Sequence, residues 1–266
     1  MSDPTRPDAP KIIAISNQKG GVGKTTTTIN LAAALVEEGF RVLIVDLDPQ
    51  GNASTGLGID ASDRTHTTYD LLLDDSPLAD VLQKTDIEDL LIAPATTDLS
   101  SADLELVSNE KRSFLMHDAL RQHAIDDYDL DFILIDCPPS LNLLTVNAMV
   151  ASDSVLVPLQ SEFFALEGLS QLMLTIREVR QSANPDIRIE GVVLTMYDKR
   201  NNLSRQVEKD ARETLGELVF KTIIPRNVRV SEAPSYAMSV LDYDSDSQGS
   251  QAYRSLAKEL VERNSV

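Results

Sequence analysis

A short segment near the start of the chain carries residue types that bind phosphate. Three glycines stand just before a lysine and a threonine: Gly20, Gly21, Gly23, Lys24 and Thr25. Glycines let a backbone curl until its N–H groups face phosphate oxygens, and a following helix adds the positive end of its dipole. Lys24 can then reach the β and γ phosphates, and the Thr25 hydroxyl can ligate Mg²⁺. The strict phosphate-loop signature has a glycine where Gln18 stands, so this chain departs from it at one position.

Three aspartates at the ends of apolar stretches could complete a magnesium site. Asp136 follows the apolar residues 132–135 and is placed like a Walker B aspartate, which holds Mg²⁺ directly or through a water molecule. Asp46 and Asp48 end the stretch 41–45, and they lie on one face if that strand continues, because side-chain direction repeats every two residues. Turn formation or helix capping before Pro49 is the alternative role for them.

The elements that must position these residues follow from apolar periodicity. Short apolar runs of strand length occur at residues 11–16, 41–45, 90–93, 132–135, 155–158, 191–196 and 222–224. Helical patterns lie between them, most clearly at residues 25–38, 167–181 and 203–215. Strands of this kind separated by amphipathic helices predict an α/β fold: a doubly wound, mostly parallel sheet with helices on both faces, as in P-loop nucleotide hydrolases. Ligands of such sheets gather at the carboxyl ends of the strands, where all of the motifs fall.

Composition limits the domain organisation and the partners. The 266 residues, 42% of them hydrophobic, suffice for one substantial core, so we expect a flexible tail over residues 1–10 and a single domain over residues 11–266. Residues 59–76 are rich in Asp, Ser and Thr and predict a mobile surface connection. The polar start and the lack of a long apolar run predict a cytoplasmic protein without a membrane partner.

The charge balance is strongly acidic. A formal net charge of −18 and a pI near 4.5 repel nucleic acid and anionic membranes as a whole. Any contact with DNA must therefore come from a local basic patch. The three histidines lack metal-ligand spacing, and the single cysteine, Cys137, excludes an internal disulfide and is expected to be a packed small residue.

The phosphate-loop segment resembles one family in particular. Residues 19–26, with the sequence KGGVGKTT, are similar to the deviant Walker A motif of the ParA/MinD family of ATPases, whose mark is the extra lysine at Lys19. Further blocks resemble chromosomal, Soj-type ParA proteins, and together they span nearly the whole chain. They are DLDPQGNA at 46–53, DCPPSL at 136–141, FALEGL at 164–169 and IPRNVR at 224–229.

The resemblance implies an ATPase with ATP and Mg²⁺ as cofactors and with weak intrinsic turnover. It implies that Lys19 reaches across a dimer interface to the phosphates of the partner's ATP, so that dimerisation depends on ATP. It also implies that Lys24 contacts phosphate, that Asp48 positions or activates the attacking water, and that Asp46 supports a metal held by Thr25 and Asp136. The implied nucleotide-binding residues of the loop are Lys19, Gly20, Gly21, Val22, Gly23, Lys24, Thr25 and Thr26.

Two further sets of residues are assigned through the same resemblance. Strand-end positions that hold the adenine in the family correspond to Met196, Pro225, Arg226, Asn227 and Val228. An asparagine in such a loop is also a common turn former. Arg200 and Arg229 match positions that contact the DNA backbone, and arginine suits phosphate because its planar fork can bind two oxygens. The chain departs from the family in an acidic stretch, with Asp242, Asp244 and Asp246 where basic residues are common.

The favoured hypothesis is a chromosome- or plasmid-partitioning ATPase. Its ATP-bound homodimer would bind DNA non-specifically on the nucleoid, and a ParB-type centromere-binding partner would stimulate hydrolysis and release. A ParA-like ATPase that positions another cargo is the main alternative. A MinD-like membrane switch needs an amphipathic, basic C-terminal helix, whereas residues 253–266 carry Glu259 and Glu262 and predict a helix packed on the core.

Two other classes fit the chain poorly. An electron-transfer reductase similar to the nitrogenase iron protein needs two cysteines per subunit, and this chain has one. A plasmid relative with a sequence-specific DNA-binding extension needs more than the roughly ten residues that precede the first expected strand.

Overall fold

A single mixed sheet forms the centre of the described part of the chain. The computed structural model describes residues 9–74, 76–162 and 165–264, so most of the predicted N-terminal tail lies outside it. The sheet has eight strands in the order β3-β4-β2-β5-β1-β6-β7-β8, and every pairing is parallel except that of β3 with β4. The strands are β1 (Lys11–Ile15), β2 (Val42–Asp46), β3 (Gln83–Lys84), β4 (Leu90–Ala93), β5 (Phe132–Asp136), β6 (Ser154–Gln160), β7 (Arg188–Tyr197) and β8 (Val219–Pro225).

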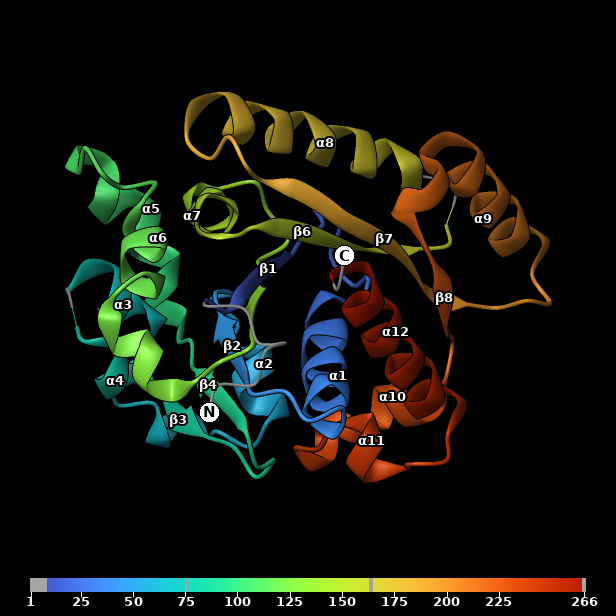
Figure 1. Ribbon diagram of the computed structural model, residues 1–266, viewed down its shortest axis with the longest axis horizontal. Coiled ribbons are helices and arrows are strands. Elements are labelled where there is room, and N and C mark those ends of the chain that lie inside the picture. Colours follow the sequence, from blue (N-terminus) through green and yellow to red (C-terminus); the bar gives the residue numbers. More distant parts are fainter. Residues whose placement is uncertain (1–8, 75, 163–164, 265–266) are drawn as a thin grey trace.

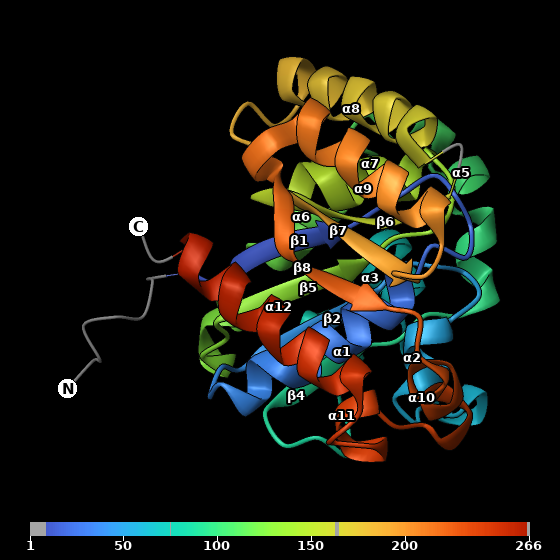
Figure 2. The ribbon, with the colours of Figure 1, turned by 90° about the vertical axis from the view of Figure 1, so that its right-hand side faces the viewer.

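Helices cover both faces of the sheet and enclose two separate cores (Figures 1 and 2). One core takes side chains from α3 (Thr68–Leu73), α4 (Leu78–Val81), α5 (Ala102–Glu105), α6 (Leu115–Leu120), α7 (Leu143–Ala151), α8 (Ala165–Ser182) and α9 (Asn202–Leu215). The other takes them from α1 (Lys24–Glu37), α2 (Asn52–Gly56), α10 (Val228–Glu232), α11 (Val240–Tyr243) and α12 (Gln248–Asn264). This two-layered covering confirms the predicted doubly wound α/β fold.

All seven predicted strands are present, with ends that differ by a few residues from the expected ones. The structure has one further strand that was not predicted. It is β3, Gln83–Lys84, a two-residue strand at the sheet edge without an apolar run. Helix α1 has the expected limits because Gly23 opens it and Gly39, at φ 91°, stops it. There the Gly39 amide bonds to the Val36 carbonyl at 2.9 Å.

The prediction for residues 59–76 was wrong in part. This segment contains α3, whose Leu71 and Leu72 are buried in the core. Its polar residues form a capping box: the Thr67 hydroxyl accepts from the Tyr69 amide, and Asp70 accepts from the Thr67 amide at 2.7 Å. Thr67 and Asp70 therefore serve as helix caps, whereas residues 60–63 before them are exposed.

The C-terminal helix packs as expected. In α12, Tyr253, Leu256 and Leu260 are buried against α1 and β8. None of the helices in the described ranges combines the length and the apolar content needed to cross a bilayer.

Candidate functional site

The glycine loop between β1 and α1 is fixed to two neighbouring strands. The Asn17 side-chain amide donates to the Pro158 carbonyl of β6 at 2.7 Å. The Thr195 hydroxyl of β7 donates to the Val22 carbonyl at 2.8 Å. Because β1, β6 and β7 are neighbours in a parallel sheet, their carboxyl ends meet at one edge and can hold the loop there.

The shape of the loop fits a phosphate group. Gly21 and Gly23 have φ values of 74° and 89°, a left-handed conformation that glycine adopts without strain. Open space surrounds Gly21, where an added Cβ would meet no atom within 4 Å. Gly23 begins α1 without a side-chain cap, so the first amides of that helix remain for a ligand.

Lys24 lies inside this loop. Its side chain is buried, and its ammonium donates to the Lys19 carbonyl at 3.2 Å. Burial lowers the pKa of Lys24, while the negative charges of Asp136 and Asp48 act in the opposite direction. A buried ammonium beside open amides is well placed to pair with a phosphate.

Oxygen atoms suited to Mg²⁺ gather beside Lys24. The hydroxyl of Thr25 donates to Asp136 Oδ2 at 2.7 Å, and that of Thr28 donates to Asp136 Oδ1 at 3.1 Å. Hydroxyl and carboxylate oxygens are the ligands that Mg²⁺ prefers, usually together with water and substrate phosphates. The residues present therefore fit a magnesium ion bound between Thr25, Asp136 and a nucleotide.

Asp46 fixes the loop that carries Asp48. Asp46 Oδ2 accepts from the Ser54 amide at 2.9 Å and from the Ser54 hydroxyl at 2.6 Å. Its other oxygen accepts from the Asp48 amide at 3.2 Å. Asp48 itself is 7% exposed, and its Oδ1 accepts from the Gln50 amide at 3.0 Å. Asp46 therefore ties the start of the loop that carries Asp48 to Ser54.

Asp46 and Asp136 lie side by side in the register of β2 and β5. Burial raises the pKa of Asp136 to about 8, and the adjacent charge of Asp46 adds to the effect. Burial likewise raises the pKa of Asp46 to about 6, although hydrogen bonds from Ser54 oppose it. Two buried carboxylates repel each other, and a divalent cation between them and a nucleotide would favour their charged forms.

Lys19 has different surroundings from Lys24. Its ammonium forms an ion pair of 2.5 Å with Glu162, in the loop after β6, and the two side chains are 41% and 47% exposed. The Gln160 side-chain amide donates to the other oxygen of Glu162 at 2.6 Å. The extra lysine of the loop therefore points to the protein surface.

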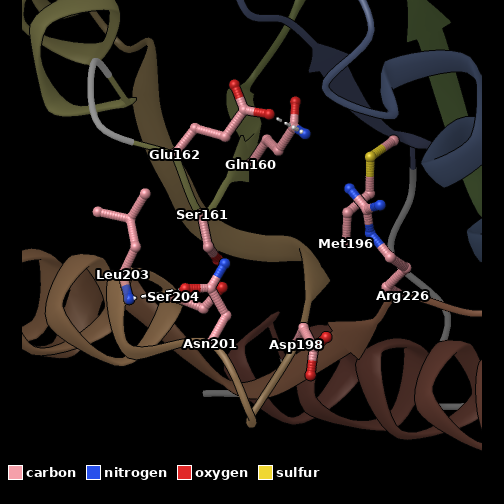
Figure 3. A pocket seen from close by; sticks show the side chains of 9 residues that line it. All are labelled: Gln160, Ser161, Glu162, Met196, Asp198, Asn201, Leu203, Ser204 and Arg226. Atoms are coloured by element: carbon pink, nitrogen blue, oxygen red, sulfur yellow. Dashed lines mark hydrogen bonds between the residues drawn. The ribbon is translucent and has the colours of Figure 1, made fainter.

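A cavity of about 490 Å³ lies at the carboxyl ends of β6, β7 and β8 (Figure 3). Of the predicted adenine-site residues, Met196 and Arg226 line it, whereas Pro225, Asn227 and Val228 are not among its lining residues. Asn227 instead caps α10, accepting from the Arg229 amide at 2.8 Å. The rest of the lining was not predicted from the sequence: Gln160, Ser161, Glu162, Asp198, Asn201, Leu203 and Ser204. The available signal was the polar run 160–162 directly after a predicted strand.

The two predicted DNA-contacting arginines are exposed but paired within the chain. Arg200 donates to both oxygens of Asp198, at 3.1 and 3.3 Å. Arg229 contacts Glu232 at 3.0 Å and Asp244 at 3.1 Å. The acidic stretch noted in the sequence therefore reaches one arginine directly, through Asp244.

The raised pKa of Asp136 predicts a pH effect on the nucleotide-free protein. A carboxyl whose pKa is raised by folding contributes its stability fully below the unfolded value, near 4, and loses it as the pH rises through about 8. With a chelator present, the unfolding free energy of Asp136→Asn should therefore rise relative to that of wild type as the pH increases. The difference between the two should grow by roughly 1 to 3 kcal/mol from about pH 5 to pH 9. Urea unfolding at several pH values measures this difference. The exposed Asp60→Asn is the control and should parallel wild type, and a parallel Asp136→Asn curve would show that Asp136 is ionised throughout.

Comparisons with known proteins agree with this geometry. A family described as an AAA domain matches residues 10–189. The chain is 56% identical over 254 residues to the chromosome partitioning protein ParA of Caulobacter vibrioides, covering 95% of this chain and 94% of that protein. It is 52% identical over 251 residues to the sporulation initiation inhibitor protein Soj of Bacillus subtilis, covering 94% and 98%.

A solved structure extends the comparison to the fold. Cobyrinic acid a,c-diamide synthase from Mycobacterium smegmatis, with bound ADP and magnesium, has a TM-score of 0.81 and 39% identity, covering 95% of this chain and 94% of that one. The alignments cover nearly the full length of this chain and of each of these proteins. This chain also has the phosphate loop, the paired aspartates and the parallel sheet. The chain belongs to the ParA/MinD family of P-loop ATPases, which use ATP with Mg²⁺, and it is close to the Soj-type ParA proteins.

Proposed function

We propose that this chain is a chromosome- or plasmid-partitioning ATPase. In this proposal the ATP-bound homodimer binds DNA non-specifically on the nucleoid, and a ParB-type partner stimulates hydrolysis and so releases the dimer. The name of the Caulobacter relative, chromosome partitioning protein ParA, supports the general role. The orientation of Lys19 carries the finer proposal, because this second loop lysine pairs with Glu162 at the surface instead of joining Lys24.

Each residue of the site has a distinct role in this mechanism. Lys24 and the amides of the glycine loop would bind the β and γ phosphates, while Thr25 and Asp136 would hold Mg²⁺, which would supply positive charge against the negative charge that develops during phosphoryl transfer. Asp48, buried beside the loop and held by Asp46, orients the attacking water.

Lys19 supplies the part of the site that one chain lacks. It would extend to the phosphates bound by a second copy and add a cation beside the transferred group. ATP would thereby join the two chains, and a dimer presents twice as many DNA contacts as a monomer. Arg200 and Arg229, which follow the neighbouring strands β7 and β8, are the proposed phosphate contacts on DNA.

The main alternative is an ATPase of the same mechanism that positions another cargo. It differs in the partner alone, so DNA binding decides between the two. A MinD-like membrane switch is less compatible with the structure. Leu256 and Leu260 of α12 are buried in the core, and Arg254 and Lys258 pair with the α1 segment at Glu37 and Glu38.

The two loop lysines should differ in what their removal abolishes. Lys24→Ala should weaken ATP binding about 10- to 100-fold, because it removes a charge-assisted contact to phosphate. Lys19→Ala should keep ATP binding close to wild type but remain monomeric. Titration with a fluorescent ATP analogue measures binding. Light scattering in an Asp48→Ala background, which slows hydrolysis, measures dimerisation. Equal loss of nucleotide in both variants would contradict the role across the interface.

ATP should increase DNA binding through the two arginines. Co-sedimentation with DNA in ATP, in ADP and without nucleotide, at two salt concentrations, should show strong binding in ATP alone. The double variant Arg200→Ala plus Arg229→Ala should bind at least about tenfold more weakly, with a salt slope reduced by roughly 0.9 for each lost phosphate contact. The control variant Lys209→Ala plus Lys258→Ala removes the same charge elsewhere. The partitioning proposal fails if ATP gives no gain over ADP.

The acidic stretch should restrain DNA binding through one contact. Asp244→Asn frees one side of the Arg229 guanidinium and should raise DNA affinity about two- to fivefold, the range of an exposed ion pair. Asp246→Asn makes the same change in net charge at an exposed position that faces Arg254. The same co-sedimentation assay compares them. An equal gain in both variants would mean that total charge, and not the Arg229–Asp244 pair, limits binding.

A further inference from the structure

Glu162 competes directly for the lysine that the proposed dimer needs. The Lys19 ammonium lies 2.5 Å from Glu162 Oε2, and the carboxylate is held from its other side by the Gln160 amide at 2.6 Å. A backbone hydrogen bond also joins these two residues, because the Glu162 amide donates to the Gln160 carbonyl at 2.8 Å. Glu162 is therefore fixed in place to receive Lys19 within its own chain.

The main chain of Lys19 is anchored, so the side chain is the part that can change partner. The Lys19 amide donates to Asn17 Oδ1 at 3.0 Å, and Asn17 in turn bonds to Pro158 of β6. The Lys19 carbonyl accepts from Lys24. Both backbone bonds persist if the four-carbon stem swings from Glu162 towards a neighbouring chain. An exchange between two acceptors thus requires no refolding of the loop.

A second observation concerns Ser161, between Gln160 and Glu162. It is 5% exposed, and its hydroxyl has no hydrogen-bond partner among the residues that the structure describes. Buried polar groups are nearly always satisfied, so this hydroxyl is available to a water molecule, a ligand or a neighbouring side chain. Ser161 lines the cavity that Glu162 and Met196 also line (Figure 3).

We propose that Glu162 is a regulatory positioning residue that holds Lys19 in the monomer and thereby raises the concentration at which ATP drives dimerisation. This inference rests on the proposed dimer. In each chain, the phosphates of the partner's ATP must displace the Glu162 carboxylate from Lys19. The ion pair keeps Lys19 from binding other anions until a nucleotide-loaded partner presents several phosphate oxygens at once. The contact works against association and leaves nucleotide binding by Lys24 unaffected.

The size of the effect follows from the exposure of the pair. An exposed ion pair is worth up to about 1 kcal/mol, which corresponds to about fivefold in an equilibrium constant. Two such pairs break when one dimer forms. Glu162→Gln, which keeps the shape and the bond to Gln160 but removes the charge, should therefore lower the dimer dissociation constant about 3- to 25-fold.

The test is a sedimentation-equilibrium series with saturating Mg-ATP in an Asp48→Ala background. Glu162→Gln should dimerise at lower protein concentration than the background alone. Glu178→Gln, an exposed position on α8, makes the same chemical change away from Lys19 and should leave dimerisation unchanged. With Lys19→Ala also present, Glu162→Gln should give no gain, since the two changes act through one contact. ATP binding, titrated at a protein concentration at which every variant is monomeric, should be equal in all variants that retain Lys24.

The outcomes separate this inference from the proposed function. If no variant dimerises with ATP, the dimer itself is wrong. If the background dimerises but Glu162→Gln matches Glu178→Gln, the dimer stands and the role of Glu162 is wrong. Weaker dimerisation of Glu162→Gln would also overturn it, since Glu162 would then support the interface. Dimerisation of Glu162→Gln without nucleotide would overturn it too, because the gain would not pass from Lys19 to phosphate.

Discussion

The repulsion between two buried carboxylates is the constraint on which the site depends. Asp46 and Asp136 face each other across β2 and β5 at the edge where the sheet meets the glycine loop. Both are fully buried, and their pKa values are raised by that burial. Such a pair is costly for a fold unless a cation or a proton accompanies it. The arrangement therefore favours a proton on Asp136 in the nucleotide-free protein, and a divalent cation beside the pair would take the place of that proton.

Hydrogen bonds from several elements stabilise the two carboxylates. Thr25 and Thr28, from the first turns of α1, donate to Asp136, while Ser54 at the start of α2 donates to Asp46. Each of these bonds joins the glycine loop or the Asp48 loop to the sheet. Charge at the centre of the site is thus coupled mechanically to the glycine loop and the Asp48 loop. A change in the bound nucleotide can act on both loops through the same carboxylates.

At the surface, the chain pairs its cations with its own acids. Lys19 pairs with Glu162, Arg200 with Asp198, and Arg229 with Glu232 and Asp244. Binding to a phosphate anion is then an exchange of partners rather than the filling of a vacant position. Such an exchange lowers affinity and makes association depend more strongly on how many phosphates a partner offers at once.

The sequence by itself determined the fold class and the centre of the site. Apolar runs of strand length separated by helical periods allow few arrangements other than a covered parallel sheet, and glycines before a lysine and threonine restrict the loop to phosphate-binding geometry. Asp136 was recognisable because it ends one of those runs. These signals are local, so they can be recognised without knowing which segments meet. The edge strand β3 and the capped helix α3 escaped recognition because their few residues carry weak patterns.

Only the tertiary structure decided which distant residues touch. The contact of Lys19 with Glu162 joins residues 143 positions apart, and that of Arg229 with Asp244 joins the start of α10 to the end of α11. No sequence periodicity predicts such pairs, because the relative positions of the helices and strands decide which exposed charged side chains meet. The same holds for Asn227, which caps α10, and for Asp46, whose bonds to Ser54 direct it towards the Asp48 loop. Packing assigns these partners because the sheet order, and not the chain order, sets which strand ends are neighbours.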